Sequence, residues 1–369
     1  MKILYVTTVG STMGFFGQLI SELVREGHTV DIACSAAETV PALYKELGCT
    51  VFPLSCSRSP LKTGNLKAVR EIRKISVDGH FDIVHCHTPI AAACTRLACR
   101  KLHKQGLRVI YTAHGFHFFK GAPLKNWLMY YPVEKFCARF TDVLVTINQE
   151  DYDRAKAKFK AGRTEYVPGV GVDIERYRNT AIDRDAKRKE LGVSPDDRLI
   201  LSVGELNENK NHVSVILALG LLPEAERACT VYAVAGVGDR KPLLTETAKA
   251  NGVRLHLLGY RKDCHELYKA ADLYIHPSYR EGLPVAVIEA LASGVPVTGA
   301  DTRGIRDLVT EAGGEVFPAG DIEKIAAILS KDCPKPNSDM SRYSVPEKSV
   351  QNSAFPHGGS AYFPLPAVM

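Results

Sequence analysis

Short apolar segments alternate with amphipathic segments over most of the chain. The apolar segments are rich in Val, Ile, Leu and Tyr, which is typical of strands buried on both faces of a parallel sheet, and the intervening segments have helical periodicity. We predict strands at residues 2–8, 29–34, 49–54, 81–86, 108–115 and 141–147, and a second series at 198–204, 230–236, 254–259, 272–278, 295–300 and 314–319. This alternation predicts an α/β fold with two doubly wound parallel sheets.

The alternation breaks at residues 165–173, where Pro and Gly residues indicate a hinge between two domains. We therefore expect a first domain over residues 1–167 and a second over residues 168–330. Ligands of such sheets bind beyond the carboxyl ends of the strands, so the two sets of strand ends should face one another across a cleft. Residues 331–369 lack periodicity and are rich in Pro and Ser, which predicts a disordered tail.

The 369 residues have the composition of an ordinary globular protein, with 45% apolar and 24% charged residues and a formal net charge of +6. The ten cysteines include no C-x-x-C pair, so we expect buried reduced thiols rather than a zinc or redox centre. The first residues have the pattern of a strand and not of a signal peptide, and no apolar stretch approaches the roughly 18 residues of a membrane span. We expect a cytoplasmic protein that could still lie on the inner face of the membrane.

Two glutamates, Glu281 and Glu289, flank a predicted helix start. Pro284 suits the first position of a helix over residues 284–292, because the N–H that proline lacks is not needed there. The free amides at that start would form an anion site, and Gly282 would let the backbone approach a ligand closely. The order of carboxylate, anion site and carboxylate matches the sugar hydroxyls, diphosphate and ribose hydroxyls of a nucleotide sugar. The alternative is a pair of ordinary surface charges, which we would favour for an isolated pair.

The segment that holds these glutamates, EGLPVAVIEALASGVPV, resembles the E-x7-E motif of the retaining glycosyltransferases of family 4, which have the GT-B fold of two Rossmann-like domains. Other segments are similar to the branch of this family that builds bacterial exopolysaccharides and capsules: TMGFFGQLI, FDIVHCHTP, YTAHGFHFFKGAPLKNWLMYYPVEKF, SVGELNENKNH and ADTRGIRDLV. The resemblance covers roughly residues 1–330. It implies transfer of a sugar from a nucleotide diphosphate sugar, with UDP as the expected nucleotide, to a polyprenyl-diphosphate-linked saccharide.

The resemblance also implies roles for individual residues. Glu281 and His114 would meet the transferred sugar as the catalytic groups. The positions expected to bind the rest of the donor are Gly14, Lys210, Gly236, Gly282, Leu283, Pro284 and Glu289. His87 and His117 would lie on the acceptor side. The alternatives are that His114 caps a helix, that His117 packs beside its aromatic neighbours, and that Lys210 is an ordinary surface lysine.

Two features depart from the family pattern. Glu205 stands where most of the wider family has an arginine, and a glutamate there would repel a diphosphate. The tail turns Pro-rich where family members usually end in a helix, which a frameshift or truncation would explain. Two other functions stay open. A nucleotide-sugar epimerase can use the same fold, and these departures favour a catalytically impaired binding subunit.

Two further motifs contain possible metal ligands, but neither predicts a metal site. D-x-D occurs at residues 151–153 and 183–185, but both copies open helical segments, where acidic residues complement the helix dipole. His85 and His87 share one face of a strand without a third ligand nearby in the sequence. We therefore expect neither a catalytic metal nor another cofactor.

Basic residues form clusters in the predicted first domain. They are Arg58, Lys62, Lys67, Arg70, Arg73, Lys74, Arg100, Lys101 and Lys104. The segment KGAPLKNWLMYY adds Trp127, Tyr130 and Tyr131, and cations beside interfacial aromatic residues suit an anionic membrane surface or a lipid diphosphate. The alternative is a solvated face over a packed aromatic core. No nucleic-acid recognition module is visible, so nucleic acid is not an expected partner.

Overall fold

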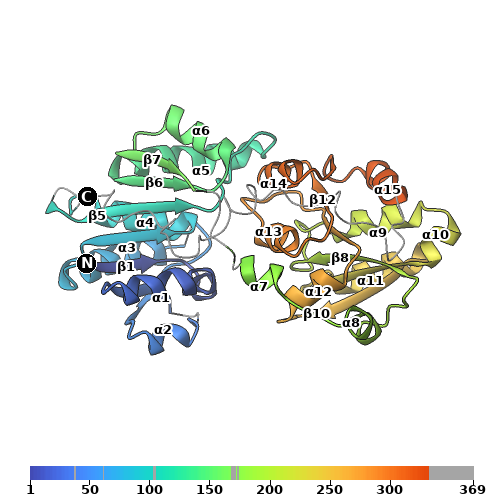
Figure 1. Ribbon diagram of the computed structural model, residues 1–369. Helices are drawn as coiled ribbons and strands as arrows, with labels where there is room; N and C mark the ends of the chain where they lie inside the picture. Colours follow the sequence, from blue (N-terminus) through green and yellow to red (C-terminus); the bar gives the residue numbers. More distant parts are fainter. Residues whose placement is uncertain (37–38, 61, 103–104, 168–171, 173, 332–369) are drawn as a thin grey trace. The chain divides into compact units, whose positions relative to one another are not determined.

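The computed structural model describes residues 1–331 except 37–38, 61, 103–104, 168–171 and 173 (Figure 1). The chain divides into two compact units, with the first ending at residue 170 and the second starting at residue 171. Apart from Lys331, the segment for which we expect a disordered tail lies outside the described residues, as does much of the expected hinge.

The first unit is built on a seven-stranded parallel sheet with the order β3-β2-β1-β4-β5-β6-β7. Its strands are β1 (Lys2–Val6), β2 (Thr29–Ser35), β3 (Val51–Leu54), β4 (Ile83–His87), β5 (Arg108–Ala113), β6 (Val143–Thr146) and β7 (Arg163–Tyr166). Along β1, Leu4 and Val6 enter one apolar core, whereas Ile3 and Tyr5 enter the other. The sheet is therefore covered on both faces, which explains why its central strands are apolar throughout.

The helices of this unit flank the sheet (Figure 1). They are η1 (Gly10–Phe16), α1 (Gly17–Arg25), α2 (Leu43–Glu46), α3 (Gly64–Asp78), α4 (Pro89–Cys99), α5 (Leu124–Cys137), η3 (Ala138–Phe140) and α6 (Gln149–Lys158). At the start of α6 the side chain of Asn148 accepts a hydrogen bond of 2.9 Å from the amide of Asp151. Asp151 of the first D-x-D copy thus lies in the first turn of a helix, as its position in the sequence predicts.

The second unit is built on a six-stranded parallel sheet with the order β10-β9-β8-β11-β12-β13. Its strands are β8 (Arg198–Val203), β9 (Thr230–Ala235), β10 (Arg254–Gly259), β11 (Leu273–His276), β12 (Val297–Ala300) and β13 (Val316–Phe317). Its helices are α7 (Ile174–Arg178), α8 (Arg184–Glu190), α9 (His212–Gly220), α10 (Glu224–Ala228), α11 (Lys241–Ala250), α12 (Cys264–Ala270), α13 (Val285–Ala292), α14 (Ile305–Glu311) and α15 (Ile322–Ser330). Asp183, in the second D-x-D copy, caps α8 by accepting a hydrogen bond of 3.0 Å from the amide of Ala186.

Two predictions about elements are wrong in detail. The seventh strand of the first sheet, β7, has the sequence RTEY and lacks the apolar run that identifies the others. It pairs only with β6, and a strand at the edge of a sheet tolerates polar side chains because one of its sides faces solvent. Pro284 is the N-cap of α13 and not its first helical residue, so the helix starts at Val285.

The strand order places one switch point in each sheet, where successive crossovers run in opposite directions. In the first sheet it lies between β1 and β4, and in the second between β8 and β11. The loops that leave neighbouring strands on opposite faces open a crevice at the carboxyl ends, where doubly wound sheets bind ligands. Lys210 and Glu281 follow β8 and β11, so the second switch point is where the sequence places its candidate anion site.

Candidate active site

Glu281 and Lys210 form an ion pair at the carboxyl end of the second sheet. The Nζ of Lys210 lies 2.7 Å from the Oε1 of Glu281, and both side chains are mostly buried. His276 also approaches this oxygen, with its Nε2 at 3.1 Å. Burial by itself raises the pKa of the Glu281 carboxyl, but the hydrogen bond from His276 and the charge of Lys210 outweigh burial and hold that pKa well below its usual range. The pair therefore presents a carboxylate and an ammonium group side by side.

Two asparagines form hydrogen bonds between the loop that carries Lys210 and the loop that carries Glu281. The side-chain amide of Asn209 donates to the carbonyl of Arg280 at 2.9 Å, and the carbonyl of Asn209 accepts from the amide of Tyr279 at 2.9 Å. Asn211 donates to the carbonyl of Pro277 at 3.3 Å while its backbone has a φ of +51°. Asparagine tolerates this left-handed conformation better than most residues. The segment ELNENKN thus cross-links two loops.

Helix α13 starts shortly after Glu281, at Val285. The first amides of a helix have no acceptor within the helix, so they suit an anion. The loop between β12 and α14 packs closely against this segment: a Cβ added to Gly304 would lie 2.3 Å from the carbonyl oxygen of Gly282. Gly304 also has a φ of +77°. The backbone of Gly282 and Leu283 is therefore held in place by a neighbouring loop.

Glu289 is held by two tyrosines from other helices. The hydroxyl of Tyr177, on α7, donates to its Oε1 at 2.6 Å, and that of Tyr268, on α12, donates to its Oε2 at 2.9 Å. Burial raises the pKa of this carboxyl, while both hydrogen bonds act in the opposite direction. Each carboxylate oxygen can accept a second hydrogen bond, so a bound hydroxyl could still reach Glu289.

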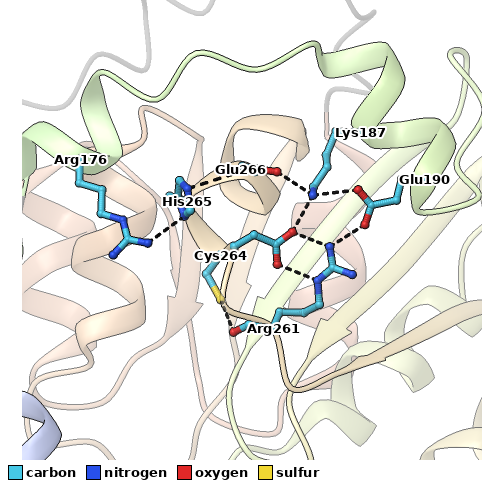
Figure 2. Close-up of polar contacts among 8 residues, drawn as sticks. Arg176, Lys187, Glu190, Arg261, Cys264, His265 and Glu266 are labelled. Atoms are coloured by element: carbon cyan, nitrogen blue, oxygen red, sulfur yellow. Dashed lines mark hydrogen bonds and ion pairs between the residues drawn. The ribbon is translucent and has the colours of Figure 1, made fainter. Parts of the chain in front are cut away.

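An ion-pair network fixes the amino end of the helix that carries Tyr268 (Figure 2). Lys187, on α8, lies 2.9 Å from Glu190, 2.6 Å from Asp263 and 2.7 Å from Glu266. Arg261 bonds to Glu190 at 2.7 Å. Figure 2 also shows Arg176, on α7, beside His265, on α12, and their side-chain nitrogens are 3.5 Å apart. The contact between Arg176 and His265 joins the two helices whose tyrosines hold Glu289.

Gly236 lies where two strand ends approach each other closely. A Cβ at this position would lie 1.8 Å from the carbonyl oxygen of Gly204, so no larger residue fits without moving the backbone. The amide of Gly236 donates to the carbonyl of Gly259 at 2.8 Å. Glu205, which follows Gly204, is exposed and accepts a hydrogen bond of 2.8 Å from the side chain of Asn207.

In the first unit, His87 and His114 lie together at the ends of β4 and β5. The Nδ1 of His87 is 3.1 Å from the Nε2 of His114, and His85 contacts Thr112 at 2.8 Å through its Nε2. Burial lowers the pKa of His114 to about 4 and that of His85 to about 3, so both imidazoles are neutral near pH 7. His87 is only 1% exposed, and its Nε2 has no hydrogen-bond partner among the described residues. Within that part of the chain, no group of three or more His, Cys, Asp and Glu side chains is arranged to hold a metal ion.

The other predicted positions of the first unit are His117 and Gly14. His117 stacks on Tyr130 with a centroid distance of 4.5 Å, so it packs beside an aromatic neighbour as the alternative interpretation states. Gly14 is exposed in η1, and a Cβ added to it would meet no atom within 4 Å. Its predicted contact with a diphosphate stays a prediction, as do the acceptor-side roles of His87 and His117.

Sequence reasoning missed the residues that hold the two glutamates. His276 and Tyr274 lie in a segment interpreted only as a strand, and Tyr177 and Tyr268 lie in helices to which no role was given. One signal was available: a histidine and a tyrosine at alternate positions share one face of a strand that is otherwise apolar. Nothing in the local sequence indicates that Tyr177 contacts a residue 112 positions away.

Helix α5 combines an aromatic inner face with an exposed apolar outer face. Trp127 and Tyr131 pack against the buried Phe118, with ring centroids at 5.6 and 5.3 Å. The large apolar residues that are exposed are Leu124, Leu128, Met129, Val133 and Phe136. The exposed basic residues on the same helix are Lys125 and Lys135. We call these seven residues the α5 surface. None of the helices in the described part of the chain combines the length and apolar character that crossing a bilayer requires.

Two family models match the chain in succession. The model described as "Glycosyltransferase Family 4" matches residues 15–176, and that described as "Glycosyl transferases group 1" matches residues 183–343. EpsD of Bacillus subtilis (strain 168), which is assigned as a glycosyltransferase, is 37% identical over 315 residues, covering 84% of this chain and 81% of EpsD. An Escherichia coli protein named UDP-Gal:alpha-D-GlcNAc-diphosphoundecaprenol alpha-1,3-galactosyltransferase is 27% identical over 293 residues, covering 73% of this chain and 74% of that protein.

Solved structures share the fold at lower identity. Anabaena HepE in complex with UDP aligns with a TM-score of 0.76 at 20% identity over 96% of both chains, and its complex with UDP-glucose aligns with a TM-score of 0.75. WaaG, a glycosyltransferase involved in lipopolysaccharide biosynthesis, aligns with a TM-score of 0.69 at 20% identity over 97% of this chain and all of WaaG. With the two family models and the identity to EpsD, these alignments show that the chain is a glycosyltransferase of family 4 with the GT-B fold.

Proposed function

We propose that this glycosyltransferase moves a sugar, with retention of anomeric configuration, from a UDP-sugar to a polyprenyl-diphosphate-linked saccharide during assembly of a bacterial surface polysaccharide. The observation that carries the proposal is the ion pair of Lys210 and Glu281 beside the free amides at the start of α13. This places a cation, an anion-binding helix start and a carboxylate at the switch point of one sheet. A sugar diphosphate needs each of these groups.

In the proposed mechanism, Lys210 and the first amides of α13 stabilise the leaving diphosphate. Negative charge grows on the phosphate as its bond to the sugar breaks, and groups already aimed at it stabilise that charge without reorganisation. These groups would neutralise the diphosphate without a metal or another cofactor. Because Lys210 bonds to Glu281 in the free protein, the donor would share this cation with Glu281. The acceptor attacks from the side that the phosphate leaves, and the phosphate takes the acceptor's proton.

The remaining residues bind the ends of the donor. Glu281 would accept hydrogen bonds from hydroxyls of the transferred sugar, and Glu289 from those of the ribose. Gly236 and the backbone of Gly282 and Leu283 would line the nucleotide and phosphate positions. The neutral His114 would donate or accept a hydrogen bond at the sugar, and the acceptor-side roles go to His87 and His117.

The lipid-linked acceptor is supported by the name of the Escherichia coli relative, whose acceptor is a diphosphoundecaprenol-linked sugar. The α5 surface supports it independently, since exposed apolar and basic residues together suit the boundary of an anionic membrane. A protein that works on such an acceptor would act at the cytoplasmic face of the membrane and contact it peripherally.

The test is release of UDP from a panel of UDP-sugars, with and without a lipid extract that contains the polyprenyl-linked saccharides. We expect release that requires the extract and that falls by at least about a hundredfold in Glu281→Gln, because the charged carboxylate at the reacting sugar is replaced by a neutral amide with one acceptor oxygen fewer. The matched control is Glu208→Gln, a glutamate of the same region that is 81% exposed and pairs with Arg240. Conversion of a UDP-sugar to its epimer without the extract would instead show an epimerase, and UDP binding without any turnover would show an impaired binding subunit.

A further inference from the structure

His276 is a buried residue that contacts the carboxylate of Glu281. It is the last residue of β11 and is only 2% exposed. Its Nε2 lies 3.1 Å from the Oε1 of Glu281, and its Nδ1 lies 2.8 Å from the hydroxyl of Tyr274, two residues earlier in the same strand. The Oγ of Ser278 is 3.2 Å from Nε2. Both ring nitrogens of this buried imidazole therefore form hydrogen bonds.

The chemistry of the partners fixes the direction of these hydrogen bonds. Glu281 is held as a carboxylate, which can only accept, so the Nε2 of His276 must carry a proton. Burial lowers the pKa of His276, and Lys210 acts in the same direction while Glu281 opposes it. The imidazole is thus neutral near pH 7, its Nδ1 is an acceptor, and the hydroxyl of Tyr274 donates to it. The tyrosine selects the tautomer that can hold the carboxylate.

The two oxygens of Glu281 differ as a result. Oε1 accepts from both His276 and Lys210, whereas no hydrogen bond to Oε2 is found among the described residues. Glu289 contrasts with this, because a tyrosine bonds to each of its oxygens. The protein therefore occupies one oxygen of Glu281 and leaves the other available to a ligand.

We propose that Tyr274 and His276 are positioning residues that hold Glu281 through Oε1, so that Oε2 is directed to the hydroxyls of the transferred sugar. This inference rests on the role of Glu281 in the proposed function. Neither residue contacts the substrate in this scheme. They act on the sugar end of the donor alone, since Tyr177 and Tyr268 hold the glutamate assigned to the ribose.

A matched pair of substitutions tests this proposal. Tyr274→Phe removes the hydroxyl that selects the tautomer of His276. Tyr232→Phe is the control, because Tyr232 is equally buried in a strand of the same sheet and its hydroxyl lies 3.0 Å from the Nδ1 of His212, an imidazole for which no contact with Glu281 is found in the described chain. Both changes remove one hydroxyl from a buried tyrosine–histidine pair, so their costs in stability should be similar.

The readouts separate positioning from general damage. With the most active donor of the panel above, we expect the kcat of Tyr274→Phe to fall about tenfold relative to Tyr232→Phe, while its affinity for UDP alone stays unchanged. His276→Gln should behave like Tyr274→Phe, with partial recovery because the glutamine amide can donate to Glu281. Equal kcat in the two tyrosine variants would overturn the proposal. A loss of UDP affinity in Tyr274→Phe as large as its loss of kcat would also overturn the proposal, because the effect would then not be confined to the sugar end of the donor.

Two further measurements distinguish failure of this inference from failure of the proposed function. If Glu281→Gln retains full activity, the assigned sugar site is wrong; if only Glu281→Gln loses activity, the site stands and the positioning role fails. The second measurement needs no substrate: nitrogen NMR of the histidine side chains, assigned with His276→Gln, should show His276 protonated at Nε2 at pH 7. A tautomer protonated at Nδ1 would overturn the hydrogen-bond direction on which the proposal depends.

Discussion

Glu289 illustrates how single hydrogen bonds set the chemistry of this site. Its carboxyl is largely buried, which favours the protonated form, and the hydroxyls of Tyr177 and Tyr268 favour the carboxylate. A protonated Glu289 would accept hydrogen bonds from ribose hydroxyls less well. The two tyrosines therefore extend the pH range over which the proposed ribose contact can form.

Substitution of Tyr268 by Phe should shift this range. Loss of a donor to the carboxylate raises the pKa of Glu289 further, and binding that needs the carboxylate is lost as the pH falls through that pKa. We expect the decline of UDP affinity on acidification to start about one pH unit higher in Tyr268→Phe than in the native protein. Calorimetric titration of UDP between pH 4.5 and 8 measures the shift.

Tyr232→Phe serves again as the control, because the phosphates of UDP titrate identically with both variants. Superimposable pH profiles for Tyr268→Phe and Tyr232→Phe would contradict the role of Tyr268. Loss of affinity that is uniform across the pH range would indicate altered packing instead.

At the scale of elements, the start of α13 depends on a loop that belongs to another part of the sequence. Gly304 precedes α14, and its backbone lies so close to Gly282 that a methyl group would require a shift of the backbone. The conformation of the proposed phosphate contact is therefore set by Gly304, a residue that lies outside the E-x7-E motif. Close packing and a left-handed backbone conformation together explain why the segment ADTRGIRDLV has a glycine at position 304.

Gly304→Ala should weaken UDP binding by at least about tenfold, because its Cβ displaces the backbone of Gly282 and Leu283. Gly294→Ala is the control: this glycine has a φ of +76°, close to the +77° of Gly304, but a Cβ there would meet no atom within 4 Å. Backbone strain should cost each variant about 1 kcal/mol of stability, measured by chemical denaturation. Gly304→Ala should lose more than Gly294→Ala, because its Cβ also meets the backbone of Gly282. Retained UDP affinity in Gly304→Ala would show that the loop contact does not control the helix start.

Most of the elements could be predicted from the sequence, since buried parallel strands and amphipathic helices leave a strong periodic pattern. The edge strand β7 escaped because its RTEY sequence lacks that pattern. Glu281, Glu289 and Lys210 could be named because they stand beside turn signals within a family motif. Their supporting residues could not, because the contacts of His276 and Tyr177 depend on how distant elements pack.

At the scale of the molecule, the first unit carries clusters of basic residues, and the structure shows that it also exposes large apolar side chains. The rings of Trp127 and Tyr131 pack inward, as the alternative of an aromatic core states, whereas Leu124 and Leu128 are 72% and 70% exposed. An exposed apolar surface flanked by lysines is typical of proteins that bind at a membrane interface. The α5 surface is therefore the part of the chain that we expect to meet the bilayer.

Reversal of two charges tests this expectation. Lys125→Glu with Lys135→Glu should lower binding to vesicles that contain phosphatidylglycerol by more than about tenfold, since each basic residue near an anionic surface contributes about 1 kcal/mol. The control is Lys241→Glu with Lys249→Glu, which makes the same change in net charge at exposed positions of α11 in the second unit. Sedimentation with vesicles measures binding. Equal losses in both double variants would mean that net charge, and not the α5 surface, governs the interaction.

Glu134 is the only acidic residue from Leu124 to Arg139, and it points into the core, where Arg96 and Tyr111 bond to its two oxygens at 2.8 and 3.0 Å. The solvent-facing side of α5 therefore carries Lys125 and Lys135, Arg139 follows in η3, and neither element supplies an exposed carboxylate or imidazole to counter them. Lysine and arginine keep their charge throughout the range of cytoplasmic acidity. Attachment through this helix would respond to ionic strength and to the anionic lipid content of the bilayer, and acid stress in the cell would leave it engaged.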